Sequence, residues 1–186
     1  MSELLGGAGR EARFVGLYEA TYVDLVRFAR RRVVEGAAED VVEEAFLAAW
    51  RRLEEVPREV GEARAWLFGV VWRTILNAER GVRRQRAVAV RLAGSVAECS
   101  PDSADFVARR VDLGRAWEQL SAVHQEALAL VVVEDLSARQ AASVLGITAV
   151  AFRLRLSRAR HALRAQLDHR RTPRVVPADA IEGQHS

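Results

Sequence analysis

The sequence predicts an all-α protein made of two small helical bundles joined by a flexible linker. Three observations lead to this prediction. Apolar residues recur with helical spacing along most of the chain. No stretch keeps up the two-residue alternation of a strand, and the helical pattern is lost between residues 93 and 105. A chain of 186 residues is long enough for two such bundles.

Three helices are predicted in the first block, residues 11–92. Apolar stripes with helical spacing run through residues 14–29 and 42–53. Pro57 and Gly61 then interrupt the pattern. A third helix follows in the segment RAWLFGVVWRTILNAER, which is apolar on nearly all sides through its middle.

The linker and the second block follow. Residues 93–105, AGSVAECSPDSAD, lose the periodicity and gain Ser, Pro and acidic residues, which is typical of a linker. Helical spacing resumes over Phe106–Leu120 and His124–Val133, inside a second block that spans residues 106–171. Residues 172–186 have nothing to pack against, and we expect them to be disordered.

The second block contains the pattern of a helix-turn-helix in LSARQAASVLGITAVAFRLRL. Ser137 followed by Gln140 matches a capping box, Gly146 can end that helix in the left-handed conformation, and Thr148 can cap the next one. On the second helix one face is predicted to be buried, with Phe152, Leu156, Ala159 and Leu163. The opposite face is predicted to be exposed, with Val150, Arg153, Leu154, Ser157 and His161.

An exposed helix of this kind fits the major groove of DNA. The charge is sorted along the chain: residues 35–44 hold five acids and no base, and residues 139–171 hold eight arginines against one aspartate. Arginine blocks favour nucleic-acid binding, because attraction to the phosphates dominates the affinity of a protein for nucleic acid. The alternative explanation is that the same blocks are solvated faces of helices. The absence of lysine among the 28 basic residues is also explained by a coding bias toward arginine.

Aromatic residues precede a second arginine block in the first domain. Trp66, Phe68 and Trp72 are followed by the arginines of residues 73–91. Rings beside basic side chains are typical of single-stranded DNA binding, which combines base stacking with backbone charge. Packing in the protein core is the competing interpretation of the same rings.

Several function classes lack support in the sequence. The lone Cys99 can form neither an internal disulfide nor a multi-cysteine zinc site. Glu43 and Glu44 are adjacent and point in different directions on a helix, and His124 and His161 have no recognisable partner by spacing. We therefore expect no catalytic site, metal or cofactor. The first residues lack the apolar segment of a signal peptide, and we expect a cytoplasmic protein without membrane insertion.

The chain resembles the sigma-70 family of RNA polymerase subunits. AAEDVVEEAFLAAWRRL and ARAWLFGVVWRTILNAERGVRR resemble region 2, and LSAVHQEALALVVVEDLSARQAASVLGITAVAFRLRLSRARHAL resembles region 4. A chain with these two regions alone is similar to the extracytoplasmic-function (ECF) group, and the likeness covers roughly residues 14–167. It implies a sigma factor that binds core RNA polymerase and directs transcription initiation at promoters. The alternative, a free-standing helix-turn-helix regulator, leaves the acidic segment and the Trp–Arg helix unexplained.

The resemblance also implies roles for individual residues. An acidic helix would bind the β′ clamp of core polymerase through Glu39, Asp40, Glu43, Glu44 and Leu47. The region 2-like domain would read and melt the minus-ten element through Arg64, Trp66, Trp72, Arg73, Arg80, Arg83 and Arg84. The region 4-like domain would read the minus-thirty-five element through Ser137, Arg139, Thr148, Ala149, Val150, Arg153, Leu154, Ser157 and Arg158.

The resemblance implies further partners and some departures. The segment 56–64 would capture a flipped promoter base, and the linker would run through the polymerase toward the RNA exit path. Core polymerase would be contacted at the β flap as well as at the β′ clamp, and an anti-sigma factor would inhibit the protein. Arg73 stands where the family usually has Asn, and segment 56–64 lacks the common Phe-Arg-Gly start. Val150 and Leu154 stand where the family often has Gly and Ser, and either could contact a thymine methyl group.

Overall fold

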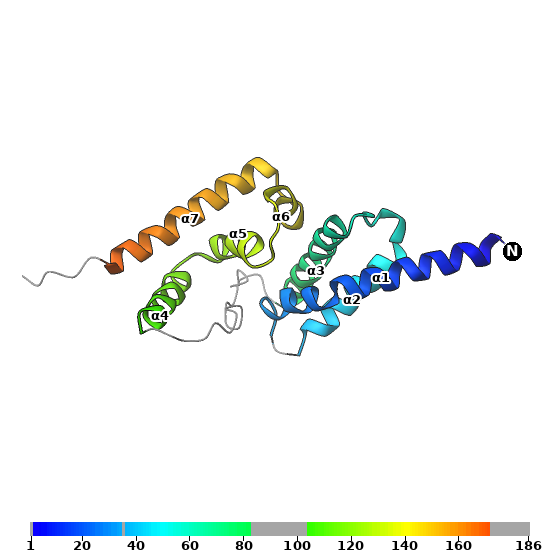
Figure 1. Ribbon diagram of the computed structural model, residues 1–186, viewed down its shortest axis with the longest axis horizontal. Coiled ribbons are helices and arrows are strands. Elements are labelled where there is room, and N and C mark those ends of the chain that lie inside the picture. Colours follow the sequence, from blue (N-terminus) through cyan, green and yellow to red (C-terminus); the bar gives the residue numbers. More distant parts are fainter. Residues whose placement is uncertain (1, 35, 83–103, 172–186) are drawn as a thin grey trace, which may run out of the picture.

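The computed structural model describes residues 2–34, 36–82 and 104–171, and all regular secondary structure within them is helical (Figure 1). The predicted all-α class is confirmed. None of these helices combines the length and the apolar character needed to cross a membrane. The predicted tail and most of the predicted linker lie outside the described residues. The elements in chain order are α1 (Ser2–Arg30), α2 (Ala38–Arg51), the 3₁₀ turn η1 (Leu53–Glu55), α3 (Val60–Val82), α4 (Ala104–Glu118), α5 (Ala122–Val132), α6 (Ala138–Leu145) and α7 (Ala149–Arg171).

Helices α1, α2 and α3 form the first bundle, in which each helix packs on the other two. The predicted stripes are buried in part: Leu25 and Phe28 of α1 are fully buried, as is Val42 of α2, and Phe46 is nearly so, whereas Tyr18 of α1 is 40% exposed. The rings of Phe28 and Phe68 stack with their centroids 4.6 Å apart. Burying a side chain of this size contributes about 1.5–3 kcal/mol, so this stacked pair anchors α3 to α1.

Helix α3 begins earlier than the sequence predicts. The Glu59 carboxylate accepts hydrogen bonds from the backbone N–H groups of Gly61 at 2.9 Å and Glu62 at 2.7 Å, and these bonds lower the pKa of Glu59. This cap satisfies first-turn donors, so the helix starts at Val60 and Gly61 lies inside it. The prediction that Gly61 interrupts the helical pattern is wrong, and the segment 56–64, expected to be a loop that captures a flipped base, is helical from residue 60 onward.

Helix α7 packs against α4, α5 and α6 to form the second bundle. The predicted capping box of α6 is confirmed: the Gln140 N–H donates to Ser137 Oγ at 3.2 Å, and the Ser137 N–H donates to Gln140 Oε1 at 3.0 Å. Gly146 ends α6 with a φ of 66°. The Ala151 N–H donates to Thr148 Oγ1 at 3.1 Å, which caps α7. These local bonds fix the turn of the helix-turn-helix.

The two bundles meet where α6 lies on α3 (Figure 1). A Cβ atom at Gly69 of α3 would lie 3.7 Å from the Cα atom of Val144 of α6, so the helices approach closely at this point. The buried apolar residues of both bundles form one contiguous core. This packing explains why α3 is apolar on nearly all sides: one face packs on α1 and α2, and another packs on α6.

Candidate functional site

Helix α7 presents the predicted minus-thirty-five face to solvent. On its inner side Phe152 and Ala159 are fully buried and Leu156 is 6% exposed, so the helix cannot rotate about its axis without exposing them. On its outer side Val150 is 72% exposed and Leu154 is 52% exposed. Apolar side chains this exposed contribute nothing to the core, so they are available for an external contact.

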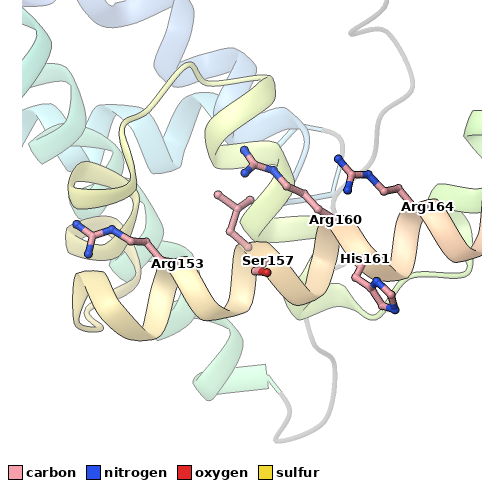
Figure 2. Close-up of a pocket in the computed structure, with 6 residues that line it drawn as sticks. Arg153, Ser157, Arg160, His161 and Arg164 are labelled. Atoms are coloured by element: carbon pink, nitrogen blue, oxygen red, sulfur yellow. The ribbon is translucent and has the colours of Figure 1, made fainter.

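A cluster of basic side chains continues this face along α7. Figure 2 shows a surface pocket whose labelled residues all project from this one helix, with three arginines among them. Arg160 and Arg164 were not among the predicted contacts, although both lie in the arginine block of residues 139–171. Three guanidinium groups along about three turns of an exposed helix are suited to bidentate phosphate contacts. The labelled residues are Arg153, Ser157, Arg160, His161 and Arg164.

The other predicted minus-thirty-five residues divide into two kinds. The side chains of Ser137 and Thr148 are hydrogen-bonded to backbone N–H groups as helix caps, so they position the motif. Ser157 and Arg158 are exposed on α7, and Ala149 is half-buried. Arg139 of α6 is exposed, and its Nη2 donates to Glu62 Oε1 of α3 at 3.2 Å.

Helix α2 carries the predicted acidic surface. Asp40, Glu43 and Glu44 are exposed, and Leu47 is 55% exposed beside them. Glu39 accepts a hydrogen bond from Arg30 of α1, and this bond lowers the pKa of Glu39. Four carboxylates and an exposed leucine on one helix form a surface suited to a basic protein partner.

The predicted minus-ten residues on α3 differ in their surroundings. Arg64 Nε donates to the Asp24 carboxylate at 2.7 Å, its Nη1 donates to the Glu134 carbonyl oxygen at 2.9 Å, and its guanidinium lies over the Phe68 ring. Arg73 is exposed, whereas the other members are half-buried or undescribed. Trp66 and Trp72 are half-buried, the side chain of Arg80 is not described, and Arg83 and Arg84 lie outside the described residues.

Phe68 does not serve the predicted base stacking. The side chain is fully buried and stacks on Phe28. The core interpretation therefore holds for this ring. Trp66 remains accessible and lines a pocket together with Arg139 and Gln140 of α6.

A buried cluster of four charged residues was not predicted. Arg31 and Arg32, which follow α1, meet Glu126 of α5 and Glu134 of the α5–α6 loop. We call these four residues the interdomain charge cluster. A signal exists in the sequence: Glu126 and Glu134 flank the apolar run of residues 127–133, where a free carboxylate would be costly to bury. The partners stand about a hundred positions away, so no local pattern identifies them.

A metal site finds no support in the described residues. Nowhere in residues 2–34, 36–82 and 104–171 do three His, Cys, Asp or Glu side chains gather in a way that could hold an ion. His124 of α5 is half-buried and His161 of α7 is exposed. The chemistry available at the surfaces described above is recognition by charge, hydrogen bonds and apolar contact.

Comparison with known families accounts for both bundles. The family model for sigma-70 region 2 matches residues 17–88, and the model for sigma-70 region 4 matches residues 110–163. The chain is 33% identical over 170 residues to the ECF RNA polymerase sigma factor SigL of Mycobacterium tuberculosis, covering 90% of this chain and 96% of SigL. It is 32% identical over 176 residues to the RNA polymerase sigma factor CnrH of Cupriavidus metallidurans, covering 87% and 90%.

A solved structure supports the same assignment. CnrH in complex with the cytosolic domain of CnrY superposes with a TM-score of 0.54 at 28% identity, covering 84% of this chain and 88% of that one. The two bundles thus correspond to regions 2 and 4 of the sigma-70 family. The chain belongs to the ECF group of the sigma-70 family and is an RNA polymerase sigma factor. Such proteins bind core RNA polymerase and direct initiation at promoters.

Proposed function

We propose that the two bundles share promoter recognition between them. The domain of residues 11–92 reads and melts the minus-ten element, and the domain of residues 106–171 reads the minus-thirty-five element through α7. The observation that carries this proposal is the outer face of α7, where Val150, Arg153 and Leu154 are exposed on a helix whose inner face is fixed in the core. A helix held in this way can lie in the major groove with its N-terminal turns against base edges.

Helix α7 would recognise bases through two kinds of contact, hydrogen bonds from an arginine and an apolar contact from a leucine. Arg153 can donate two hydrogen bonds to a guanine edge, and Leu154 can contact a thymine methyl group. Arg158, Arg160 and Arg164 lie further along the helix, where phosphate contacts would hold the helix in register. Ser137 and Thr148 act indirectly, because their side chains cap helices.

Polymerase binding belongs to the acidic surface of α2. Asp40, Glu43, Glu44 and Leu47 are all exposed on α2, so a basic segment of the β′ clamp would gain both charge complementarity and an apolar contact. Reversing Asp40 and Glu43 together to arginine should weaken binding to core polymerase without changing the circular dichroism. The matched control reverses Glu11 and Glu19, exposed acids on α1. Equal affinities of the two variants would contradict this assignment.

The minus-ten assignment rests on the described part of α3. Trp66 and Trp72 are half-buried and Arg73 is exposed, so this helix offers ring edges and positive charge on accessible positions. Stacking of an unpaired base on an aromatic ring contributes about 1–3 kcal/mol. Arg73 replaces the usual Asn of the family, and we propose that it contacts a phosphate there.

The protein works by recruitment and has no catalytic activity of its own in this proposal. It acts in the cytoplasm, where the polymerase and the chromosome are. The linker of residues 93–105 passes through the polymerase toward the RNA exit path, and the β flap is a second contact on core polymerase. An anti-sigma factor is a further proposed partner, in keeping with the complex that CnrH makes with the cytosolic domain of CnrY. A pull-down from the native cell, followed by competition with core polymerase, tests that partner.

Gel shifts on promoter fragments, with and without core polymerase, separate this function from that of a free-standing regulator. A sigma factor should shift its promoter specifically only when core is present. The regulator reading predicts tight and specific binding by the protein alone. In the same assay, replacing Arg153 by alanine should lower the discrimination between promoter variants at one position.

A further inference from the structure

Two large apolar side chains lie open to solvent on the outer face of α7. Val150 is 72% exposed and Leu154 is 52% exposed, so neither is held by the packing of the second bundle. Apolar surface left in water forgoes the free energy that its burial would release. Both side chains are therefore available to an apolar group of a partner.

The structure of α7 holds these two side chains at a set spacing. They are four residues apart, so they lie on one face of the helix and about 6 Å apart along its axis. Phe152 and Leu156, which alternate with them, are buried, so rotation of the helix would expose core residues. The first turn is fixed by Thr148, whose Oγ1 accepts a hydrogen bond from the Ala151 N–H at 3.1 Å.

The charges around the apolar pair favour a nucleic acid as its partner. Arg153 is exposed beside Leu154, and Arg160 and Arg164 project from the following turns of the same helix (Figure 2). The chain carries no acidic residue between positions 146 and 167. The phosphates of DNA attract a helix of this charge, so the apolar pair would face the base edges in the major groove.

The major groove offers such a pair one kind of apolar group. The C5-methyl group of thymine projects into it, whereas the other groups that identify a base pair there are hydrogen-bond donors and acceptors. Successive base pairs are about 3.4 Å apart, so side chains about 6 Å apart reach methyl groups within two base-pair steps. Cytosine methylated at C5 carries the same group at the same position. Valine and leucine side chains have no hydrogen-bonding atoms, so they do not distinguish thymine from 5-methylcytosine.

We propose that Val150 and Leu154 form a reader of 5-methylpyrimidines, which contacts two C5-methyl groups within two base-pair steps of each other in the minus-thirty-five element. The inference rests on the proposed role of α7 and adds the class of base that this role leaves open. The preferred element carries thymine at both positions, and 5-methylcytosine can replace either thymine. Methylation of a cytosine at either position therefore raises the affinity of the promoter.

The test uses holoenzyme made from core polymerase and the full chain. Selection from a promoter library with randomised minus-thirty-five bases first gives the preferred element. Each thymine of that element is then replaced by deoxyuridine, which removes the methyl group and keeps the base-pairing atoms. At two thymines the replacement should weaken binding about fourfold each, as expected for the burial of one methyl group. At the same two positions, 5-methylcytosine should bind about fourfold more tightly than cytosine.

The variant Val150→Ala/Leu154→Ala should lose most of the preference for thymine over deoxyuridine, because alanine side chains end short of the methyl groups. Alanine is a better helix former than valine or leucine, so α7 stays helical, and circular dichroism checks this. The matched control is Val132→Ala in α5, which shortens a valine that is also 72% exposed. This control should keep the fourfold preference, whatever its effect on the total affinity.

Equal binding of thymine and deoxyuridine elements by the starting chain would overturn the reader, as would a preferred element without two thymines at this spacing. An undiminished thymine preference in Val150→Ala/Leu154→Ala would also overturn it and would assign the preference to DNA shape. A thymine preference without any gain from 5-methylcytosine would overturn the class of base. Failure of the proposed function gives a different result: selection would return no minus-thirty-five preference, and Arg153→Ala would have no effect either.

Discussion

Replacing Glu134 by leucine is expected to destabilise the protein far more than the loss of a surface ion pair would. The carboxylate is 2% exposed and accepts hydrogen bonds from both arginines of the interdomain charge cluster. Without it, Arg31 loses both hydrogen bonds to Glu134, and Arg32 keeps only Glu126 as a carboxylate partner in a site away from water. Burial raises the pKa of Glu126 and Arg32 opposes that rise, so this carboxylate is itself costly to keep ionised.

The expected magnitude follows from the burial of the pair. Removing one partner of a buried ion pair costs about 3–5 kcal/mol. For a urea slope of about 2 kcal/mol per molar, a loss of about 3 kcal/mol lowers the unfolding midpoint by about 1.5 M. Because the cluster joins the two bundles, its loss should also separate a single unfolding transition into two, one for each bundle.

The assay is urea unfolding followed by tryptophan fluorescence, since the chain has four tryptophans. The double variant Arg31→Met/Glu134→Leu removes one charge of each sign, so it should recover most of the lost stability. The surface control is Glu55→Leu, which breaks the exposed pair with Arg52 and should leave the midpoint unchanged. A midpoint shift below about 0.3 M for Glu134→Leu would refute the reasoning, because it corresponds to only about 0.6 kcal/mol.

Three further predictions concern single positions. Gly146→Ala should lower the free energy of unfolding by roughly 1–2 kcal/mol in thermal unfolding, because alanine is strained at the φ of 66° found there. Gly114→Ala in α4 should raise the free energy of unfolding, because the position has open space around it and alanine is the better helix former. Because the cap lowers the pKa of Glu59, its contribution to the free energy of unfolding is complete above the ordinary pKa of about 4.3 and is lost as the pH falls through the lowered pKa. Glu59→Gln should remove this pH-dependent loss of stability from the acid unfolding curve measured by circular dichroism. Arg153→Ala should relax base preference at one promoter position, and a uniform fall in affinity with a smaller salt slope would instead identify a phosphate contact.

Features fixed by neighbouring residues could be predicted from the sequence. The capping box of Ser137 and Gln140, the left-handed Gly146 and the Thr148 cap each involve residues within three positions, and all are present. The buried and exposed faces of α7 follow from helical spacing alone, and they are confirmed. The prediction from local sequence is wrong at Gly61. The Glu59 carboxylate caps the first turn there, so the helix includes a glycine that would usually interrupt it.

The interface between the bundles could not be predicted in this way. Arg32 lies 94 positions before Glu126 and 102 before Glu134, and no periodic pattern relates such distant residues. The one feature of the sequence that indicates an additional packing partner is α3, which is apolar on more faces than a three-helix bundle requires. Phe68 shows the same limit, because an aromatic residue before an arginine block fits a base or a core equally well until its neighbours are known.

Run-off transcription with purified components tests the central claim most directly. Core polymerase, this protein and a template with minus-ten and minus-thirty-five elements should together give a transcript of one length. Omitting the protein, or changing either promoter element, should abolish that transcript. A template that is repressed by the protein alone, with no transcript dependent on it when core is added, would contradict the account.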